Sequence, residues 1–133
     1  MKVADIMQTA VRTVPSDTPV SDVVVSLADA RVSGLPVVDT RGRGVGVVST
    51  TDLIAAQAET RSAQERQILE QTSVQDLMTR KPLTIESDAE LREAARHMLY
   101  ADVRRLFVEE EGALVGVVSQ TDIVHAVATG KLA

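Results

Sequence analysis

A seven-residue pattern of hydroxyl and carboxylate side chains occurs twice in the chain. Residues 46–52 read Gly-Val-Val-Ser-Thr-Thr-Asp, and residues 116–122 read Gly-Val-Val-Ser-Gln-Thr-Asp. In both copies apolar residues precede the polar ones, which predicts a short buried strand that leads directly into a helix. The first turn of a helix leaves backbone N–H groups unpaired, so polar side chains at this point can face a ligand. The pattern therefore predicts two ligand-facing turns.

The two turns belong to a duplication that extends along most of the chain. Residues 3–7 match residues 74–78, and residues 13–17 match residues 84–88, each at an offset of 71. At the glycines of the two turns the offset falls to 70. This period is longer than that of common solenoids. We expect repeat 1 over residues 1–60, a helical linker rich in helix-forming residues over 61–73, and repeat 2 over 74–133.

Each repeat is expected to fold as β-α-β-β-α, because strand-like apolar runs flank stretches with apolar residues every three or four positions. A sheet of three short strands is too small to enclose a core, so we expect the two repeats to pack together. The strands are predicted at residues 12–14, 35–38, 45–48, 106–108 and 114–118.

The helix ends are predicted from capping residues. Thr18 and Asp88 are expected to cap the first helix of each repeat, with Pro19 at the first helical position of repeat 1. The glycine of Ser33-Gly34 is expected to end the first helix of repeat 1. The second helices are expected to begin at Thr51 or Asp52 in repeat 1 and at Thr121 in repeat 2.

The composition excludes several classes of function. The chain has 133 residues, 44% apolar and 25% charged, which fits one globular domain. A net charge of −5 and a near absence of aromatic residues disfavour nucleic acid and anionic membranes as partners. The absence of cysteine excludes disulfides and thiolate metal sites. With no signal-peptide pattern and no apolar run of membrane length, we expect a soluble cytoplasmic protein.

Several motifs together resemble one known family. Each repeat has, in order, Asp-apolar-Met, a Thr-apolar pair, a helix, a Leu-x-Val strand (Leu-Pro-Val-Val-Asp in repeat 1), and the Gly-Val-Val-Ser-x-Thr-Asp turn. This order resembles the CBS domain, and the tandem copies resemble the CBS pair, or Bateman module, over essentially the whole chain. The resemblance implies an α/β (α+β) fold of two β-α-β-β-α repeats packed sheet to sheet about a pseudo-twofold axis, with two ligand clefts. We expect a stand-alone CBS-pair protein.

The resemblance also implies a ligand and the residues that bind it. Family members bind adenosine compounds, so AMP, ADP or ATP is expected, with NAD or S-adenosylmethionine as further possibilities and no obligatory cofactor. Asp52 and Asp122 match the aspartate that binds ribose; the alternative is that each only caps its helix. Ser49, Thr51, Ser119 and Thr121 match hydroxyl donors to ribose or phosphate, and Thr13, Val14, Thr84, Ile85, Pro36 and Val37 match the wall around the base.

A pair of arginines makes the two expected sites unequal. Arg104 and Arg105 precede the Leu-Phe-Val strand and match a basic pair of the family, where they suit a phosphate group. The alternative is that they are solvated, or that they pair with nearby glutamates. Repeat 1 has Ser33-Gly34 at this point, without positive charge, so the anionic ligand is expected at repeat 2. Phe107 replaces the family's proline, which changes the shape of that wall.

The leading hypothesis is a regulatory module without catalytic activity that binds an adenine nucleotide and acts on an unknown partner protein. It is expected to form a homodimer, a disc of four repeats. The alternative is a ligand-free dimerisation or interaction module. An enzyme has no constellation of residues behind it, and no metal is expected: residues 109–111 (Glu-Glu-Glu) could hold Mg²⁺ with a nucleotide, but a solvated turn is favoured.

Overall fold

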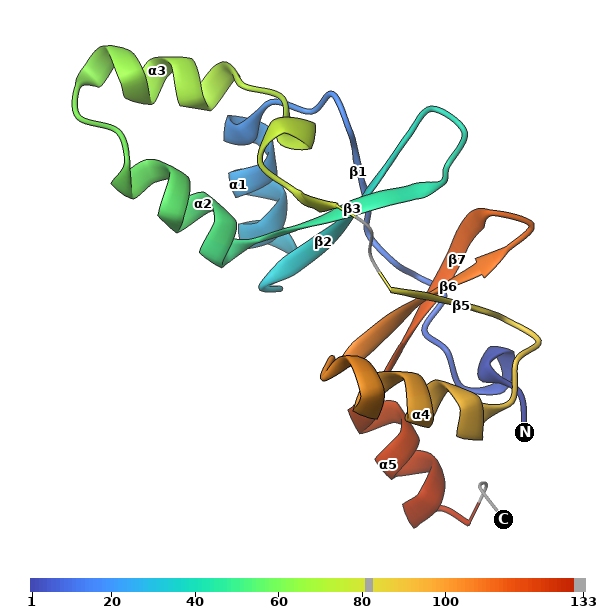
Figure 1. Cartoon of the computed structure of the whole chain (residues 1–133). Helices are drawn as coiled ribbons and strands as arrows, with labels where there is room; N and C mark the ends of the chain where they lie inside the picture. Colours follow the sequence, from blue (N-terminus) through green and yellow to red (C-terminus); the bar gives the residue numbers. More distant parts are fainter. Residues whose placement is uncertain (81–82, 131–133) are drawn as a thin grey trace. The chain divides into compact units, whose positions relative to one another are not determined.

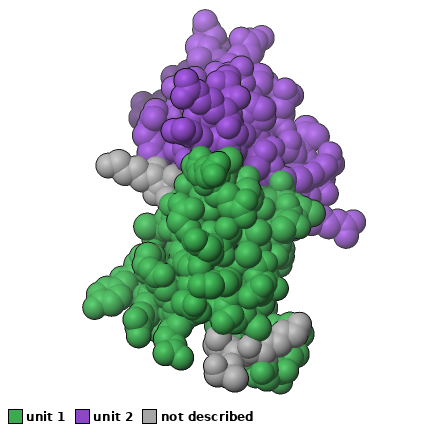
Figure 2. Space-filling view, turned by 90° about the vertical axis from the view of Figure 1, so that its right-hand side faces the viewer, with its two compact units in different colours: residues 1–11, 83–133 green, residues 12–82 purple. Residues whose placement is uncertain are grey.

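A computed structural model describes residues 1–80 and 83–130 of the chain. The residues form two compact units (Figure 2). Unit 1 combines Met1–Val11 with Leu83–Ala133, and unit 2 is Arg12–Pro82. The units therefore do not coincide with the two sequence repeats, because the first eleven residues of repeat 1 pack with repeat 2.

Unit 2 is a four-stranded sheet with three α-helices over its described residues (Figure 1). The strand order is β1-β2-β3-β4; β1 runs parallel to β2, and the other neighbours are antiparallel. The strands are β1 (Val14–Pro15), β2 (Gly34–Val38), β3 (Gly44–Ser49) and β4 (Thr79–Arg80). The helices are α1 (Val20–Ala30), α2 (Thr50–Ala58), α3 (Ala63–Gln71) and the 3-10 turn η2 (Val74–Asp76).

Unit 1 repeats this architecture with fewer elements. Its sheet has the order β5-β6-β7, with β5 parallel to β6 and β6 antiparallel to β7. Helices α4 and α5 lie along one face of the sheet (Figure 1). The elements are η1 (Val3–Asp5), β5 (Thr84–Glu86), α4 (Leu91–Ala101), β6 (Arg105–Glu110), β7 (Ala113–Ser119) and α5 (Gln120–Ala128).

The segment that begins each repeat packs on the sheet of the other repeat. We call residues 1–11 the N-terminal arm. Val3 of this arm is completely buried in the core of unit 1, and Gln8 forms an antiparallel bridge with Val117 of β7. In unit 2, Val74 is likewise completely buried, and Thr79 pairs with Val47 of β3. The same stretch of sequence therefore completes each unit from outside its own repeat.

The repeated glycine is required by this packing. A Cβ atom added at Gly116 would lie 2.8 Å from both the carbonyl oxygen of Gln8 and the Sδ atom of Met7. At Gly46 it would lie 2.5 Å from the Sδ atom of Met78 and 2.7 Å from the carbonyl oxygen of Thr79. The methionine of the Asp-apolar-Met motif thus packs against the glycine of the other repeat's turn, which links two motifs that are far apart in sequence.

The arm also carries an exposed ion pair. Lys2 Nζ lies 2.9 Å from Glu90 Oε1, at the start of α4. The hydrogen bond from Lys2, reinforced by its charge, lowers the pKa of the Glu90 carboxyl below its usual value of 4.5. Both side chains are at least half exposed, so this pair orients the arm more than it stabilises the fold.

Each unit has its own hydrophobic core. Helix α1 buries a stripe of Val20, Val23 and Leu27, and α4 buries a stripe of Leu91, Ala94 and Met98, against their sheets. The predicted α+β class and the β-α-β-β-α order of the repeats are confirmed, and α3 lies within the stretch predicted as a helical linker. In the part of the chain that the structure describes, no helix combines the length and apolarity that crossing a membrane requires.

The predicted caps of the first helices are wrong. The residue before each helix is Pro19 or Glu90, and neither makes a side-chain capping bond. Instead, the N–H of Val20 donates to the carbonyl of Thr72, and the N–H of Leu91 donates to the carbonyl of Met1, each at 2.9 Å. The acceptor is a backbone carbonyl from the end of the linker for α1 and from repeat 1 for α4, so the side chains of Thr18 and Asp88 are not needed as caps.

The predicted end of the first helix is also wrong. Helix α1 ends at Ala30, followed by Arg31 in the left-handed conformation with φ 54°, and Asp102 (φ 56°) has the same place after α4. Gly34 is instead the first residue of β2, opposite Ser49. Arg31 and Asp102 thus adopt a left-handed conformation that glycine would adopt more easily.

Candidate functional site

The turn from β7 into α5 fixes the carboxylate of Asp122. Ser119 precedes the helix, and its Oγ atom accepts a hydrogen bond from the N–H of Asp122 at 3.1 Å. In return, Asp122 Oδ2 accepts from the N–H of Ser119 at 2.9 Å. This capping box satisfies two backbone donors of the helix start and holds the half-buried carboxylate at its Oδ2 atom.

The turn from β3 into α2 has the same geometry. Asp52 Oδ2 accepts from the N–H of Ser49 at 2.9 Å, and Ser49 Oγ accepts from the N–H of Asp52 at 3.2 Å. Helices α2 and α5 therefore begin one residue before Thr51 and Thr121, because the serine rather than the threonine is the cap. The sequence repeat is thus a repeat of hydrogen bonds as well as of residue types.

Asp52 and Asp122 do cap their helices, which was the alternative to ribose binding, but capping does not use the whole carboxylate. Each cap occupies only the Oδ2 atom, which leaves Oδ1 outside the capping box. A carboxylate that its helix already holds at one oxygen can accept further hydrogen bonds with a smaller loss of rotational freedom on binding. Capping and ligand binding are therefore compatible roles for Asp52 and Asp122.

The Oδ1 atoms of the two aspartates differ. Gln8 of the N-terminal arm donates from Nε2 to Asp122 Oδ1 at 3.3 Å. The corresponding residue of repeat 2 is Thr79, and the structure, which describes both residues, has no hydrogen bond between Thr79 and Asp52. Sequence reasoning missed Gln8 because it lies 114 residues from Asp122. The available signal was its place directly after the methionine of the Asp-apolar-Met motif.

The threonines of both turns are exposed to solvent. Thr51 and Thr121 occupy the second position of their helices, and neither side chain makes a hydrogen bond to the described residues. Thr121 and Asp122 line a cavity of about 410 Å³ between α5 and the arm. Its other walls are Asp5, Ile6, His125 and Ala126, all within unit 1. The hydroxyl of Thr121 and the carboxylate of Asp122 thus line one cavity at the start of α5.

The residues expected around the base lie on neighbouring strands. Val14 of β1 is opposite Val37 of β2, and both side chains are buried in the core of unit 2. Ile85 of β5 is buried in the core of unit 1. The side chains of these three residues thus serve the two cores. Pro36 is also buried, Thr13 is exposed and Thr84 is half-buried.

The two arginines flank the turn of unit 1. Arg105 begins β6 directly opposite Ser119, and the carbonyl of Arg104 accepts a hydrogen bond from the N–H of Gln120 at 2.8 Å. Both side chains are exposed, and in the described part of the chain neither forms a salt bridge. In unit 2, Ser33 takes the position of Arg104 and accepts from the N–H of Thr50 at 2.9 Å. The unit 1 turn therefore has two arginines at the start of the strand beside Ser119, where unit 2 has Ser33 and Gly34 beside Ser49.

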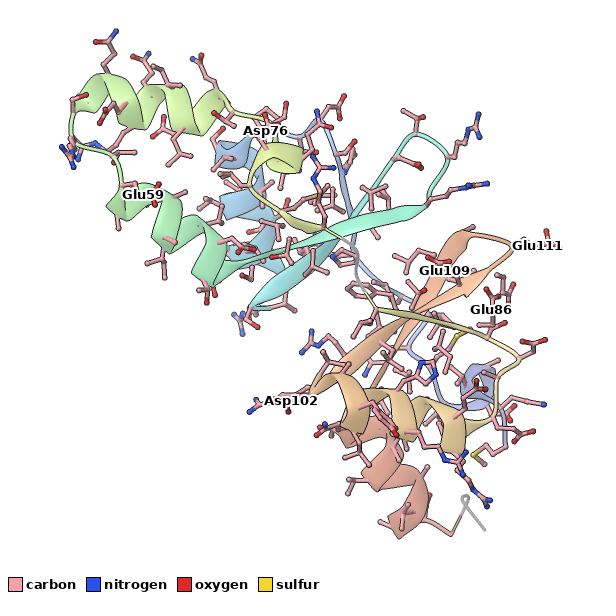
Figure 3. The ribbon with its side chains drawn as sticks, viewed as in Figure 1. Glu59, Asp76, Glu86, Asp102, Glu109 and Glu111 are labelled. Atoms are coloured by element: carbon pink, nitrogen blue, oxygen red, sulfur yellow. The ribbon has the colours of Figure 1, made fainter. Side chains whose placement is uncertain are left out.

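The glutamates of repeat 2 lie at the other end of the strand. Glu109 and Glu86 are opposite each other on β6 and β5, and Glu111 follows in the hairpin turn (Figure 3). Arg105 and Glu109 are four residues apart on one strand, or about 13 Å. The arginines and the acidic turn are therefore separate surface features. Among the described residues, no group of three or more histidine, aspartate or glutamate side chains is placed to hold a metal ion.

Comparison with known proteins gives one family. The family model described as CBS domain matches residues 3–59 and 74–129. The CBS domain-containing protein CBSX2 of Arabidopsis thaliana chloroplasts is 31% identical over 135 residues, which cover 85% of this chain and 57% of the relative. Its relative CBSX1 is 30% identical, with coverage of 82% and 56%. The chain thus spans just over half the length of these curated relatives.

The fold also matches solved structures. The crystal structure of CBSX2 in complex with AMP has a TM-score of 0.80 and 34% identity, and the match covers 98% of both chains. The CBS domain pair of protein MJ0100, in complex with 5′-methylthioadenosine and S-adenosyl-L-methionine, has a TM-score of 0.75 with 98% of both chains covered. Its 23% identity makes it a likeness of fold alone.

Proposed function

Because the chain belongs to the CBS domain family, with two CBS repeats in tandem, we propose that it is a non-catalytic regulatory module that binds an adenosine-type ligand. One observation carries this: two identical capping boxes hold Asp52 and Asp122 at helix starts with one carboxylate oxygen outside the cap. The 34% identical CBSX2 structure contains AMP, which makes AMP the first ligand to test. ADP, ATP, NAD and S-adenosylmethionine complete the panel.

We assign the stronger site to unit 1. Asp122 accepts hydrogen bonds from the ribose hydroxyls, and Ser119 and Thr121 supply hydroxyl groups beside it. Arg104 and Arg105 attract the phosphate, because they are exposed and have no carboxylate partner in the described part of the chain. The backbone at Thr84 and Ile85 and the half-buried side chain of Thr84 contribute the wall for the base. The equivalent residues of unit 2, which lacks the arginines, form the weaker site: Thr13, Val14, Pro36, Val37, Ser49, Thr51 and Asp52.

Calorimetric titration with the five ligands tests the proposal, after any co-purified ligand has been removed and identified by mass spectrometry. At a free ligand concentration of about 100 times Kd, binding raises the free energy of unfolding by roughly 2.7 kcal/mol, which a thermal-shift assay also detects. The absence of any response to all five ligands would refute nucleotide binding.

A pair of substitutions tests the choice of site. Asp122→Asn and Asp52→Asn each keep an acceptor for the serine N–H, so the helix cap survives, but each removes the charge. We expect the first to weaken AMP binding about tenfold or more, because a hydrogen bond to a charged group contributes roughly 1.5–3 kcal/mol. The second should have a smaller effect. The reverse ranking would place the stronger site in unit 2.

A ligand-free interaction module is the second candidate, and exposed apolar side chains favour it. Ile54 on α2 and Val124 on α5 hold the same repeat position and are 69% and 66% exposed. Leu99 and Tyr100 at the end of α4 are 78% and 94% exposed. Such faces suit a homodimer or a partner protein. Light scattering that shows a stable dimer, together with no response in the ligand panel, would favour this function.

The place of action stays a prediction from the sequence. We propose a cytoplasmic module that reports ligand occupancy to a partner protein. The relative CBSX2 is named as a chloroplast protein. Fractionation of the source cells, probed with an antibody to the chain, tests this part independently of ligand binding.

A further inference from the structure

We propose that Gln8 positions the carboxylate of Asp122 and thereby makes the unit 1 site selective for a ligand with an intact vicinal diol. The inference rests on the proposed function, since it concerns the same aspartate. It adds a residue from the N-terminal arm, and it predicts that the two sites differ in how strongly they discriminate between ribose and 2′-deoxyribose.

The backbone of Gln8 is fixed although its side chain is exposed. Its N–H donates to the carbonyl of Val117 at 2.9 Å, and its carbonyl accepts from the N–H of Val117 at 3.0 Å. Its carbonyl and the preceding Met7 approach Gly116 so closely that a Cβ atom would not fit there. The backbone of Gln8 is therefore fixed beside Val117 of β7, three residues before the start of α5, the helix that carries Asp122.

The carboxylate of Asp122 is held at both oxygens. Oδ2 accepts from the N–H of Ser119 at 2.9 Å, and Oδ1 accepts from Nε2 of Gln8 at 3.3 Å. A carboxylate oxygen can accept two hydrogen bonds, so each oxygen keeps one open lone pair. Two open lone pairs on a fixed carboxylate match the two adjacent hydroxyl donors of a ribose. Without the amide of Gln8, the Oδ1 side of the carboxylate is less constrained.

Unit 2 provides the natural comparison. Thr79 stands at the place of Gln8 and pairs with Val47 of β3, just as Gln8 pairs with Val117. Its side chain carries a hydroxyl in place of an amide and makes no hydrogen bond to Asp52, which among the described contacts is held by the capping box alone. Since less of the orientation is fixed before binding, the unit 2 carboxylate should discriminate less between ligands with two hydroxyls and one.

The decisive experiment replaces Gln8 by the residue of the other repeat. An Asp52→Ala background leaves only the unit 1 site intact. In this background, Gln8→Thr should weaken AMP binding about fivefold, because it removes a hydrogen bond to a charged group that is exposed and therefore weaker than average. The affinity for 2′-deoxy-AMP should change less than about twofold, because one hydroxyl contact is already missing. Calorimetry with both ligands gives the ratio directly.

The reciprocal change tests the same idea as a gain of function. In an Asp122→Ala background, Thr79→Gln should raise the preference of the unit 2 site for AMP over 2′-deoxy-AMP. As a further control, Gln8→Glu keeps the size of the side chain but places a second carboxylate beside Asp122. It should weaken AMP binding at neutral pH more than Gln8→Thr does.

The outcomes separate this inference from the proposed function. If the unsubstituted protein binds no ligand of the panel, both fail. If AMP binds but the Asp52→Ala protein does not bind it, nucleotide binding stands, but the assignment of the stronger site to unit 1 and the role of Gln8 are both refuted. If Gln8→Thr leaves the ratio of AMP to 2′-deoxy-AMP affinities unchanged, only the role of Gln8 is refuted. An equal loss of affinity for both ligands, with a lower Tm of the ligand-free variant, would mean that Gln8 acts on the fold alone.

Discussion

At the scale of single residues, Asp52 and Asp122 have a structural task that does not exclude a functional one. Each completes a capping box through one oxygen, and capping serines or aspartates contribute about 0.5–2 kcal/mol. The two turns are equal in this respect. They differ in their surroundings, because Asp122 accepts a hydrogen bond from Gln8 and the strand beside its capping serine begins with Arg105. The matched turns therefore allow stability and binding to be separated.

Ser119→Ala and Ser49→Ala should have the same effect on stability and different effects on binding. Each removes the hydroxyl that accepts from the aspartate N–H, so each should lower the free energy of unfolding by about 1 kcal/mol in urea titrations. Ser119→Ala should weaken AMP binding at the stronger site, whereas Ser49→Ala should affect only the weaker site. Equal losses of affinity from the two variants would show that the sites are equivalent.

At the scale of elements, the docking of the arm on β7 depends on a glycine. Gly116 has no room for a Cβ atom, because the carbonyl of Gln8 and the Sδ atom of Met7 lie on its face. The methionine could move aside, but the backbone carbonyl is held by the bridge to Val117. A methyl group at this position must therefore displace the arm itself.

Gly116→Ala should destabilise the protein by about 1–3 kcal/mol, as overpacking typically does. Gly44→Ala is the matched control, because that glycine also lies in a strand but a Cβ atom there meets nothing within 4 Å. Urea unfolding measures both. Limited proteolysis should cut the arm faster in the first variant only. If the two variants are equally stable, the close approach at Gly116 is not a constraint.

At the scale of the whole molecule, features that depend on neighbouring residues were predictable from the sequence, and contacts between distant segments were not. The strand-to-helix turns, the α1 and α4 stripes and the linker helix were predictable, since each depends on residues within one turn or one strand. The exchange of the arm between repeats was not, because it joins segments such as Gln8 and Asp122 across 114 positions. The wrong caps at Thr18 and Asp88 have the same origin, since segments distant in the sequence supply the acceptors.

The arm should behave as a removable part of unit 1. Deletion of residues 1–8 takes Val3 out of the unit 1 core and Met7 off Gly116, while unit 2 keeps the equivalent residues 74–80 of its own. Hydrogen exchange measured by mass spectrometry should therefore show lost protection in β7 and α5 and little change in β2 and β3.

A synthetic peptide of residues 1–11 should restore protection, with a gain in free energy of RT ln(1 + [peptide]/Kd). The same peptide with Val3→Asp should not, because it would bury a charge. Equal loss of protection in both units would contradict the assignment of the arm to unit 1.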